Sequence, residues 1–229
     1  MDFSDGSKIG MIGFALMLVG FLAILVIGIW ASIAVLEAVS PLLTSANGTI
    51  TANALNSTGV TQLAQNVSAG LANELIIPSI IAIAVIVIGL VLAGIALVSY
   101  GKKYGNNSIR SWGAYGTVVS AVGFALMLSF SFSSLIILVG MIIYAYVFKK
   151  LSEEAGYKNI SYYGYGLIVC ALFLLLYFPI GVIVFIVVDA LLVMAFRNLG
   201  KAKVDENPFD TNPSAVVKKP ARHGKKSNR

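Results

Sequence analysis

The sequence is short of charged residues, cysteine and histidine, and each shortage excludes a class of protein. Charged residues make up 11% of the 229 residues, against about a quarter in a water-soluble domain. Hydrophobic residues make up 58%, and the mean hydropathy is +0.89. The composition therefore predicts an integral membrane protein with an all-α fold.

The lone cysteine and the lone histidine argue against catalysis and metal binding. Cys170 has no partner for an internal disulfide or for a paired-cysteine metal site. His223 lies in the polar C-terminal segment, away from the apolar runs. The sequence also contains no recognisable nucleophile–base pair or phosphate loop. We expect a protein that is not an enzyme and that has no catalytic residue, cofactor or metal ion.

The first two apolar runs each have the length of one membrane span. Ile9–Val35 follows a short polar start at residues 1–8 and contains 27 residues without a charge, or about 40 Å of helix against a hydrocarbon core of about 30 Å. It is too long for the apolar region of a cleaved signal peptide, so we expect an uncleaved anchor; a pilin-type leader is the alternative. Leu75–Tyr100 is the second run, with Pro78 expected in the first helical turn.

The next two apolar runs are each long enough for two spans. Ser111–Phe148 has 38 residues without a charge, and we expect it to bend at Ser129–Ser134. Tyr162–Phe196 has 35 residues, and we expect a bend at Phe178–Pro179 because a proline disfavours helix at the residue before it. The sequence therefore predicts six transmembrane helices.

The segment between the first two spans, residues 40–74, differs from the rest in composition. It is rich in Asn, Thr, Ser, Ala and Gly and contains no Lys or Arg. We expect a loop outside the membrane, with an amphipathic helix over residues 60–75 leading into the second span. Its three N-x-[ST] sequons, at Asn47, Asn56 and Asn66, are candidate glycosylation sites; chance matches in an Asn- and Ser-rich loop are the alternative.

The positive charges predict the orientation of the chain in the membrane. With six spans, all 16 Lys and Arg residues fall on one side, which satisfies the positive-inside rule. The predicted organisation is three in–out–in hairpins at residues 9–100, 101–148 and 149–197, with both termini cytoplasmic. Residues 198–229 are predicted to form a disordered basic tail. The predicted location is the cell membrane, as a multi-pass protein.

The two cytoplasmic turns, which we call the elbows, resemble each other. They cover Lys102–Gly116 and Lys149–Gly166, and they align at an offset of 51 residues. The matching positions are Gly105, Ile109, Trp112 and Gly113 in the first elbow and Gly156, Ile160, Tyr163 and Gly164 in the second. We expect a parallel hairpin repeat; the alternative is that apolar, low-complexity sequence matches itself by chance.

The second elbow also carries a family resemblance. The stretch KKLSEEAGYKNI and the hairpin after it resemble an archaeal membrane family catalogued only as domain of unknown function nine-nine-six, in which an "s-I-F"-like step joins apolar spans. Here the step is Asn159-Ile160-Ser161, without the phenylalanine. The resemblance covers about Leu90 to Leu199. It implies an archaeal multi-span protein and implies no activity.

Small residues on the third span predict close helix packing. Gly113, Gly116, Ser120 and Gly123 recur at spacings of three and four, and small residues let membrane helices approach closely. We expect this stripe to pack against neighbouring helices and to place the third span at the centre of the bundle.

Asp189 is the one charged residue deep within a predicted span. It lies eight residues before Arg197, or about 12 Å along a helix, and an acid at that depth costs about 2.5–3.5 kcal/mol on insertion scales. One hypothesis is a proton or cation relay at Asp189. The alternative, which we favour, is a protonated carboxyl hydrogen-bonded to Ser120 at the same depth, holding two helices together.

The basic tail completes the expected interactions. Five of its cations are expected to contact anionic lipid headgroups, namely Lys218, Lys219, Arg222, Lys225 and Lys226; topology-setting and solvation are the alternative. Nucleic acid is disfavoured because no stacking aromatics are interleaved with this cluster. Two functions stay open: a structural or accessory membrane protein with a membrane-protein partner or a second copy of itself, and a small proton- or cation-coupled transporter or channel that uses Asp189.

Overall fold

The computed structural model describes residues 3–45, 58–130 and 132–201, which fold into α-helices without a strand. The six helices are α1 (Phe3–Ser45), α3 (Thr58–Lys103), α4 (Asn107–Ala125), α5 (Ser133–Ala155), α6 (Asn159–Leu176) and α7 (Phe178–Lys201). Five of them are long and apolar enough to cross a membrane. The exception is α4, whose Gly and Ser residues and single arginine make it less apolar than the other five.

The six helices form a closed ring in chain order. Each helix packs mainly against the helices before and after it, and α7 returns to pack against α1. The expectation that the third span lies at the centre is therefore wrong. That span is α4, which packs between α3 and α5 and exposes Trp112, Tyr115 and Val118 on its other face. Small residues occupy only one face of α4, so only that face can pack closely against other helices.

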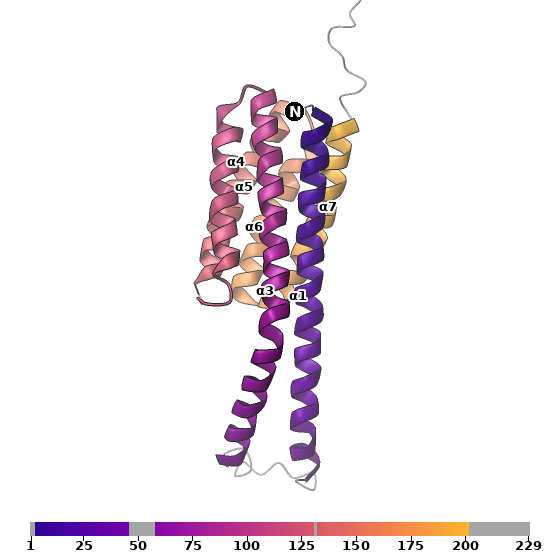
Figure 1. Cartoon of the computed structure of the whole chain (residues 1–229). Helices are drawn as coiled ribbons and strands as arrows, with labels where there is room; N and C mark the ends of the chain where they lie inside the picture. Colours follow the sequence, from indigo (N-terminus) through magenta and orange to yellow (C-terminus); the bar gives the residue numbers. More distant parts are fainter. Residues whose placement is uncertain (1–2, 46–57, 131, 202–229) are drawn as a thin grey trace, which may run out of the picture.

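Both elbows lie at the end of the ring where α1 begins and α7 finishes, and we call this the elbow end (Figure 1). Asn106 Nδ2 in the first elbow donates a hydrogen bond of 2.8 Å to Glu154 Oε1 beside the second elbow. The Ser7 hydroxyl of α1 donates to the carbonyl oxygen of Phe196 on α7. These two contacts connect the four chain segments at this end.

Two of the aligned pairs in the elbows have the same structural roles. Gly105 and Gly156 have φ angles of 63° and 68°, a left-handed conformation that terminates a helix and favours glycine. The isoleucines that follow, Ile109 and Ile160, are both fully buried. The chain therefore ends a helix and returns to the interior in the same way twice.

The bends expected within the two long apolar runs are confirmed. α4 ends at Ala125, four residues before the Ser-rich segment, and α5 begins at Ser133, near the end of that segment. α6 ends at Leu176 and α7 begins at Phe178, which places Pro179 in the first turn of a helix, where its missing N–H costs little.

The helix expected over residues 60–75 is present as the first part of α3, which begins at Thr58 and continues into the span. The extension of α1 to Ser45, into the segment of residues 40–74, was not expected. Pro78 consequently lies inside α3 rather than in its first turn. The helical spacing of apolar residues over 60–75 continues directly into the span. Pro78 has no N–H to donate to the carbonyl of Glu74, and because Glu74 is exposed, water can solvate that carbonyl.

Two helices extend beyond the other four. α1 has 43 residues and α3 has 46, or about 65 and 70 Å, whereas α6 has 18 residues, or about 27 Å. Beyond the level where Phe178 begins α7, α1 and α3 continue alone (Figure 1). We call this projection, residues 29–45 of α1 and 58–78 of α3, the arm, and the end of the ring from which it projects the arm end.

Candidate functional site

Three phenylalanines fill the ring interior toward the elbow end. They are Phe14 of α1, Phe148 of α5 and Phe196 of α7, and each is at most 1% exposed. The ring centroids are 6.1 Å apart for Phe14 and Phe148, 5.2 Å for Phe14 and Phe196, and 6.3 Å for Phe148 and Phe196. All three pairs are within the range of favourable aromatic contact. We call this cluster the elbow-side triad.

A second group of three phenylalanines fills the interior toward the arm end. Phe21 of α1 stacks on Phe185 of α7, with 4.6 Å between the ring centroids. The ring centroid of Phe124 on α4 lies 5.6 Å from that of Phe21 and 6.1 Å from that of Phe185. All three are fully buried. We call this cluster the arm-side triad. The two triads enclose one layer of the interior between them.

Asp189 lies in the layer between the triads. It follows Phe185 by four residues and precedes Phe196 by seven on the inward face of α7, or about 6 and 10 Å along the helix. Its side chain is fully buried, and neither carboxyl oxygen has a hydrogen-bond partner among the described residues.

Ser120 reaches the same layer from α4, four residues before Phe124. Its hydroxyl is fully buried and also has no partner among the described side chains and backbone. The hydrogen bond expected between Asp189 and Ser120 is therefore not formed. The sequence indicated that both residues lie at a similar level along their helices, but it could not supply the separation between α4 and α7 across the ring.

Two other polar groups lie near this layer. Cys170 of α6 is fully buried and lies near Asp189. The hydroxyl groups of Thr117 on α4 and Tyr144 on α5 are 2.8 Å apart, and the Tyr144 hydroxyl also lies 3.4 Å from the carbonyl oxygen of Leu90. Unlike Asp189, these hydroxyls have partners. Nothing in the sequence distinguished the buried Tyr144 from the nine other tyrosines.

The stripe of small residues on α4 lies against both neighbouring helices. A side chain at Gly123 would approach the backbone nitrogen of Ile137 on α5 to 2.9 Å, and one at Gly116 would approach Ile143 to 3.0 Å. Gly113 faces α3, where an added Cβ atom would lie 3.0 Å from Leu97 Cβ. Ser120 lies against Gly140 of α5. The stripe brings α4 and α5 together and keeps Ser120 in the interior.

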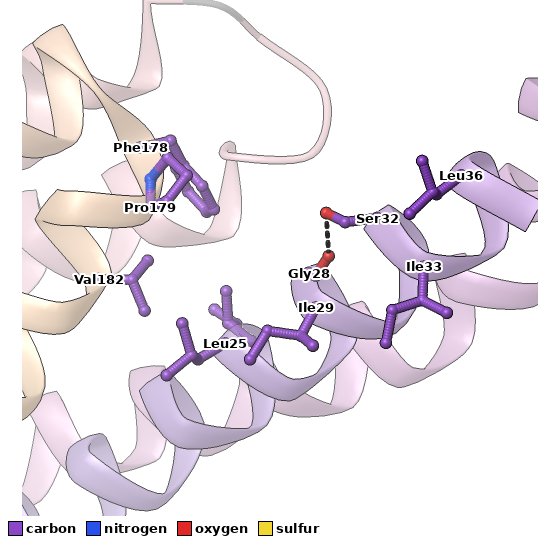
Figure 2. Close-up of a pocket in the computed structure, with 10 residues that line it drawn as sticks. Leu25, Gly28, Ile29, Ser32, Ile33, Leu36, Phe178, Pro179 and Val182 are labelled. Atoms are coloured by element: carbon purple, nitrogen blue, oxygen red, sulfur yellow. Dashed lines mark hydrogen bonds between the residues drawn. The ribbon is translucent and has the colours of Figure 1, made fainter.

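An apolar pocket lies at the base of the arm, with a volume of about 340 Å³. One wall comes from α1, with Leu25, Ile29 and Ile33, and the other from the start of α7 (Figure 2). Phe178 and Pro179 face the α1 wall (Figure 2). In that wall, the Ser32 hydroxyl donates a hydrogen bond of 2.8 Å to the Gly28 carbonyl oxygen (Figure 2). The only hydroxyl in this wall is thus already bonded to its own helix, which leaves the pocket apolar.

Several predicted site residues lie outside the described structure. These are the sequons at Asn47 and Asn56 and the tail cations Lys218, Lys219, Arg222, Lys225 and Lys226. Asn66 lies within α3, and its side chain is not described. Within residues 3–45, 58–130 and 132–201, no group of three His, Cys, Asp or Glu side chains could hold a metal ion.

Comparison with protein families, with characterised proteins and with solved structures gave no significant match. The site must therefore be interpreted from its own geometry. It offers two distinct features: an arm with an apolar base, and a closed interior layer that contains an acid without a partner.

Proposed function

We propose that this is a multi-pass membrane protein with a structural or accessory role, which anchors itself through the helix ring and presents the arm to a partner. The observation that carries the proposal is the projection of α1 and α3 past four shorter helices. The two phenylalanine triads support it, because an interior occupied by stacked side chains leaves no open pathway for a solute.

The proposed orientation puts the elbow end, and with it both termini, in the cytoplasm. Nine Lys and Arg residues belong to the described chain, and all of them lie at the elbow end: Lys8, Lys102, Lys103, Arg110, Lys149, Lys150, Lys158, Arg197 and Lys201. The rule that cytoplasmic segments carry the excess of positive charge supports this orientation. The arm and the sequons then face outward, and the basic tail meets the anionic cytoplasmic leaflet.

Apolar side chains on the base of the arm support contact with a partner inside or at the membrane. Ile33, Leu36 and Ile77 are between 50% and 65% exposed. They lie on the membrane side of Glu37 and Glu74, so this part of the arm belongs to the apolar length of α1 and α3. The shorter helices do not cover it. A membrane-spanning partner or a second copy of the chain would bury this surface.

Site-specific photo-crosslinking in native membranes tests the proposal. A photoreactive residue at Ile33 should give a discrete protein adduct, because the partner would cover the base of the arm. The matched control is Val118, an equally exposed β-branched residue on the outer face of α4, which should give lipid adducts only. An adduct of twice the monomer mass would identify a second copy as the partner. Lipid adducts alone from both positions would contradict the accessory role.

A second candidate function is a small proton- or cation-coupled transporter, and the unpartnered carboxyl of Asp189 favours it. The purified protein in liposomes then carries ion flux by itself, and Asp189→Asn removes that flux while assembly is retained. The accessory role predicts no flux from the wild-type protein. The archaeal family resemblance supports neither candidate over the other, because it implies no activity.

A further inference from the structure

We infer that Asp189 is the anionic centre of a closed site that binds one monovalent cation, either a proton or an ion of the size of sodium, and that is reached from the elbow end. This inference goes beyond the accessory role and does not depend on it. A protein that only presents an arm needs no acid between two layers of phenylalanine.

The first argument is the number of polar atoms without a partner in one layer. Both carboxyl oxygens of Asp189 and the hydroxyl of Ser120 are buried and unbonded among the described residues. Buried polar atoms in folded proteins are almost always bonded to protein, water or an ion. A carboxylate left alone in an apolar interior is especially costly. The two unpartnered carboxyl oxygens of Asp189 therefore indicate a small cationic occupant. The Ser120 hydroxyl, which lies against Gly140 of α5, is the other unpartnered oxygen in the layer.

The second argument is charge, which limits the occupant to one positive unit. α6 contributes Cys170 near Asp189, and α1 presents no titratable side chain at this level. Across the ring, Tyr144 of α5 is bonded to Thr117. Arg197, two turns further along α7, is exposed at the elbow end. A single positive charge neutralises the layer, whereas a divalent ion would leave a net charge in an apolar interior. Oxygen donors also favour a proton or a hard ion over a soft metal.

The third argument is the distribution of polar side chains along the interior. On the elbow side of the layer, the ring centroid of Tyr100 lies 5.9 Å from that of Phe196. The Tyr100 ring also stacks on Tyr104, with 6.4 Å between the ring centroids, and Tyr104 is half-buried at the first elbow. The Ser7 hydroxyl bonds to the Phe196 carbonyl at the same level. Polar groups thus lead from the elbow surface to the elbow-side triad.

The arm side of the layer has a different lining. The pocket beyond the arm-side triad has a volume of about 210 Å³, and Ser79 is the one residue with a polar side chain in its wall. Its other lining residues are Ile24, Ile27, Gly28, Ile83, Met127, Leu128 and Phe178. A cation has no polar groups to follow in this direction. Polar groups therefore approach the closed site from the elbow side, and binding there produces no flux across the membrane.

The test measures the thermal unfolding midpoint of the full chain in detergent, with choline chloride as the reference salt. Sodium chloride is titrated against choline at constant ionic strength, and pH is then varied in choline alone. A bound sodium ion raises the midpoint by about 5–10 °C at a concentration about 100 times its Kd. A bound proton instead gives a midpoint that falls as the pH rises, without a response to sodium.

Two variants assign the response to the site. Asp189→Asn, which has nearly the same shape and no charge, should remove whichever response the wild type shows. Glu74→Gln, at an exposed acid on α3, should retain it. If Asp189→Asn does not accumulate, Asp189→Glu replaces it and should shift the sodium or pH dependence, because the carboxyl moves. The inference is overturned by a wild type that responds to neither sodium nor pH, by an Asp189→Asn response equal to wild type, or by an unshifted Asp189→Glu.

Discussion

At Gly140, α5 approaches the backbone of α4 so closely that a side chain would not fit. A Cβ atom there would lie 2.9 Å from the Ser120 nitrogen and 3.0 Å from its Cα. Backbone atoms cannot rotate away as a flexible side chain can. The hydroxyl of Ser120 is held inside the ring by the same contact, so Gly140 influences both the packing and the candidate site.

We predict that Gly140→Ala lowers the free energy of unfolding by about 1–3 kcal/mol, because α4 and α5 must separate to admit the methyl group. Gly28→Ala is the matched control, since Gly28 is also helical and has no atom within 4 Å of the added Cβ. It should be neutral or stabilising by up to about 1 kcal/mol, the ordinary gain of alanine over glycine in a helix. Thermal unfolding in detergent measures both, and equal shifts would contradict the proposed clash.

The elbows are the elements that connect the hairpins. Asn106 is the N-cap of α4, and its side-chain oxygen accepts hydrogen bonds from the backbone nitrogens of Ser108 at 3.0 Å and Ile109 at 3.2 Å. Its side-chain nitrogen donates to Glu154. One amide therefore starts a helix and joins the two elbows.

We predict that Asn106→Ala costs about 0.5–2 kcal/mol, the usual value for loss of an N-cap. Asn106→Asp keeps the acceptor but places a second carboxylate beside Glu154, so it should recover only part of the loss. Asn159→Ala is the control, because Asn159 is exposed in the second elbow, and α6 has no side-chain cap bond; its effect should stay within about 0.5 kcal/mol. A cost at Asn159 equal to that at Asn106 would contradict the capping role.

At the scale of the whole molecule, the ring has a polar, positively charged end and an opposite end that carries the arm. Lys158 lies at the elbow end and Glu74 lies on the arm, and both are exposed. The single native cysteine, Cys170, is fully buried. The chain is therefore suited to single-cysteine labelling without removal of its own thiol.

We predict that Glu74→Cys reacts with a membrane-impermeant maleimide in intact cells, and that Lys158→Cys reacts only after the membrane is broken. The reason is the excess of positive charge at the elbow end, which favours the cytoplasmic side. The wild-type chain controls for Cys170 and should remain unlabelled under both conditions. Labelling of Lys158→Cys in intact cells would reverse the proposed orientation.

The sequence by itself determined roughly where the chain turns between the helices of its second half. Gly105, Gly156 and Pro179 act locally: a left-handed glycine ends a helix, and the first turn of a helix accepts a proline at little cost. The level of Asp189 along the last helix was also predictable, because it depends only on a count along one helix. Local rules missed the extension of α1, which continues through Pro41 to Ser45, although they did predict helix over residues 60–75.

Only the tertiary structure decided how the helices close into a ring and what surrounds Asp189. The two triads join phenylalanines from α1, α4, α5 and α7, and the unpartnered state of Asp189 and Ser120 depends on the distance across the ring. Rotations and offsets between helices set these contacts, and they leave no pattern within one helix. Within an apolar run, the sequence does not distinguish a phenylalanine that faces lipid from one that faces the interior. The enclosed layer could therefore be identified only from the tertiary structure.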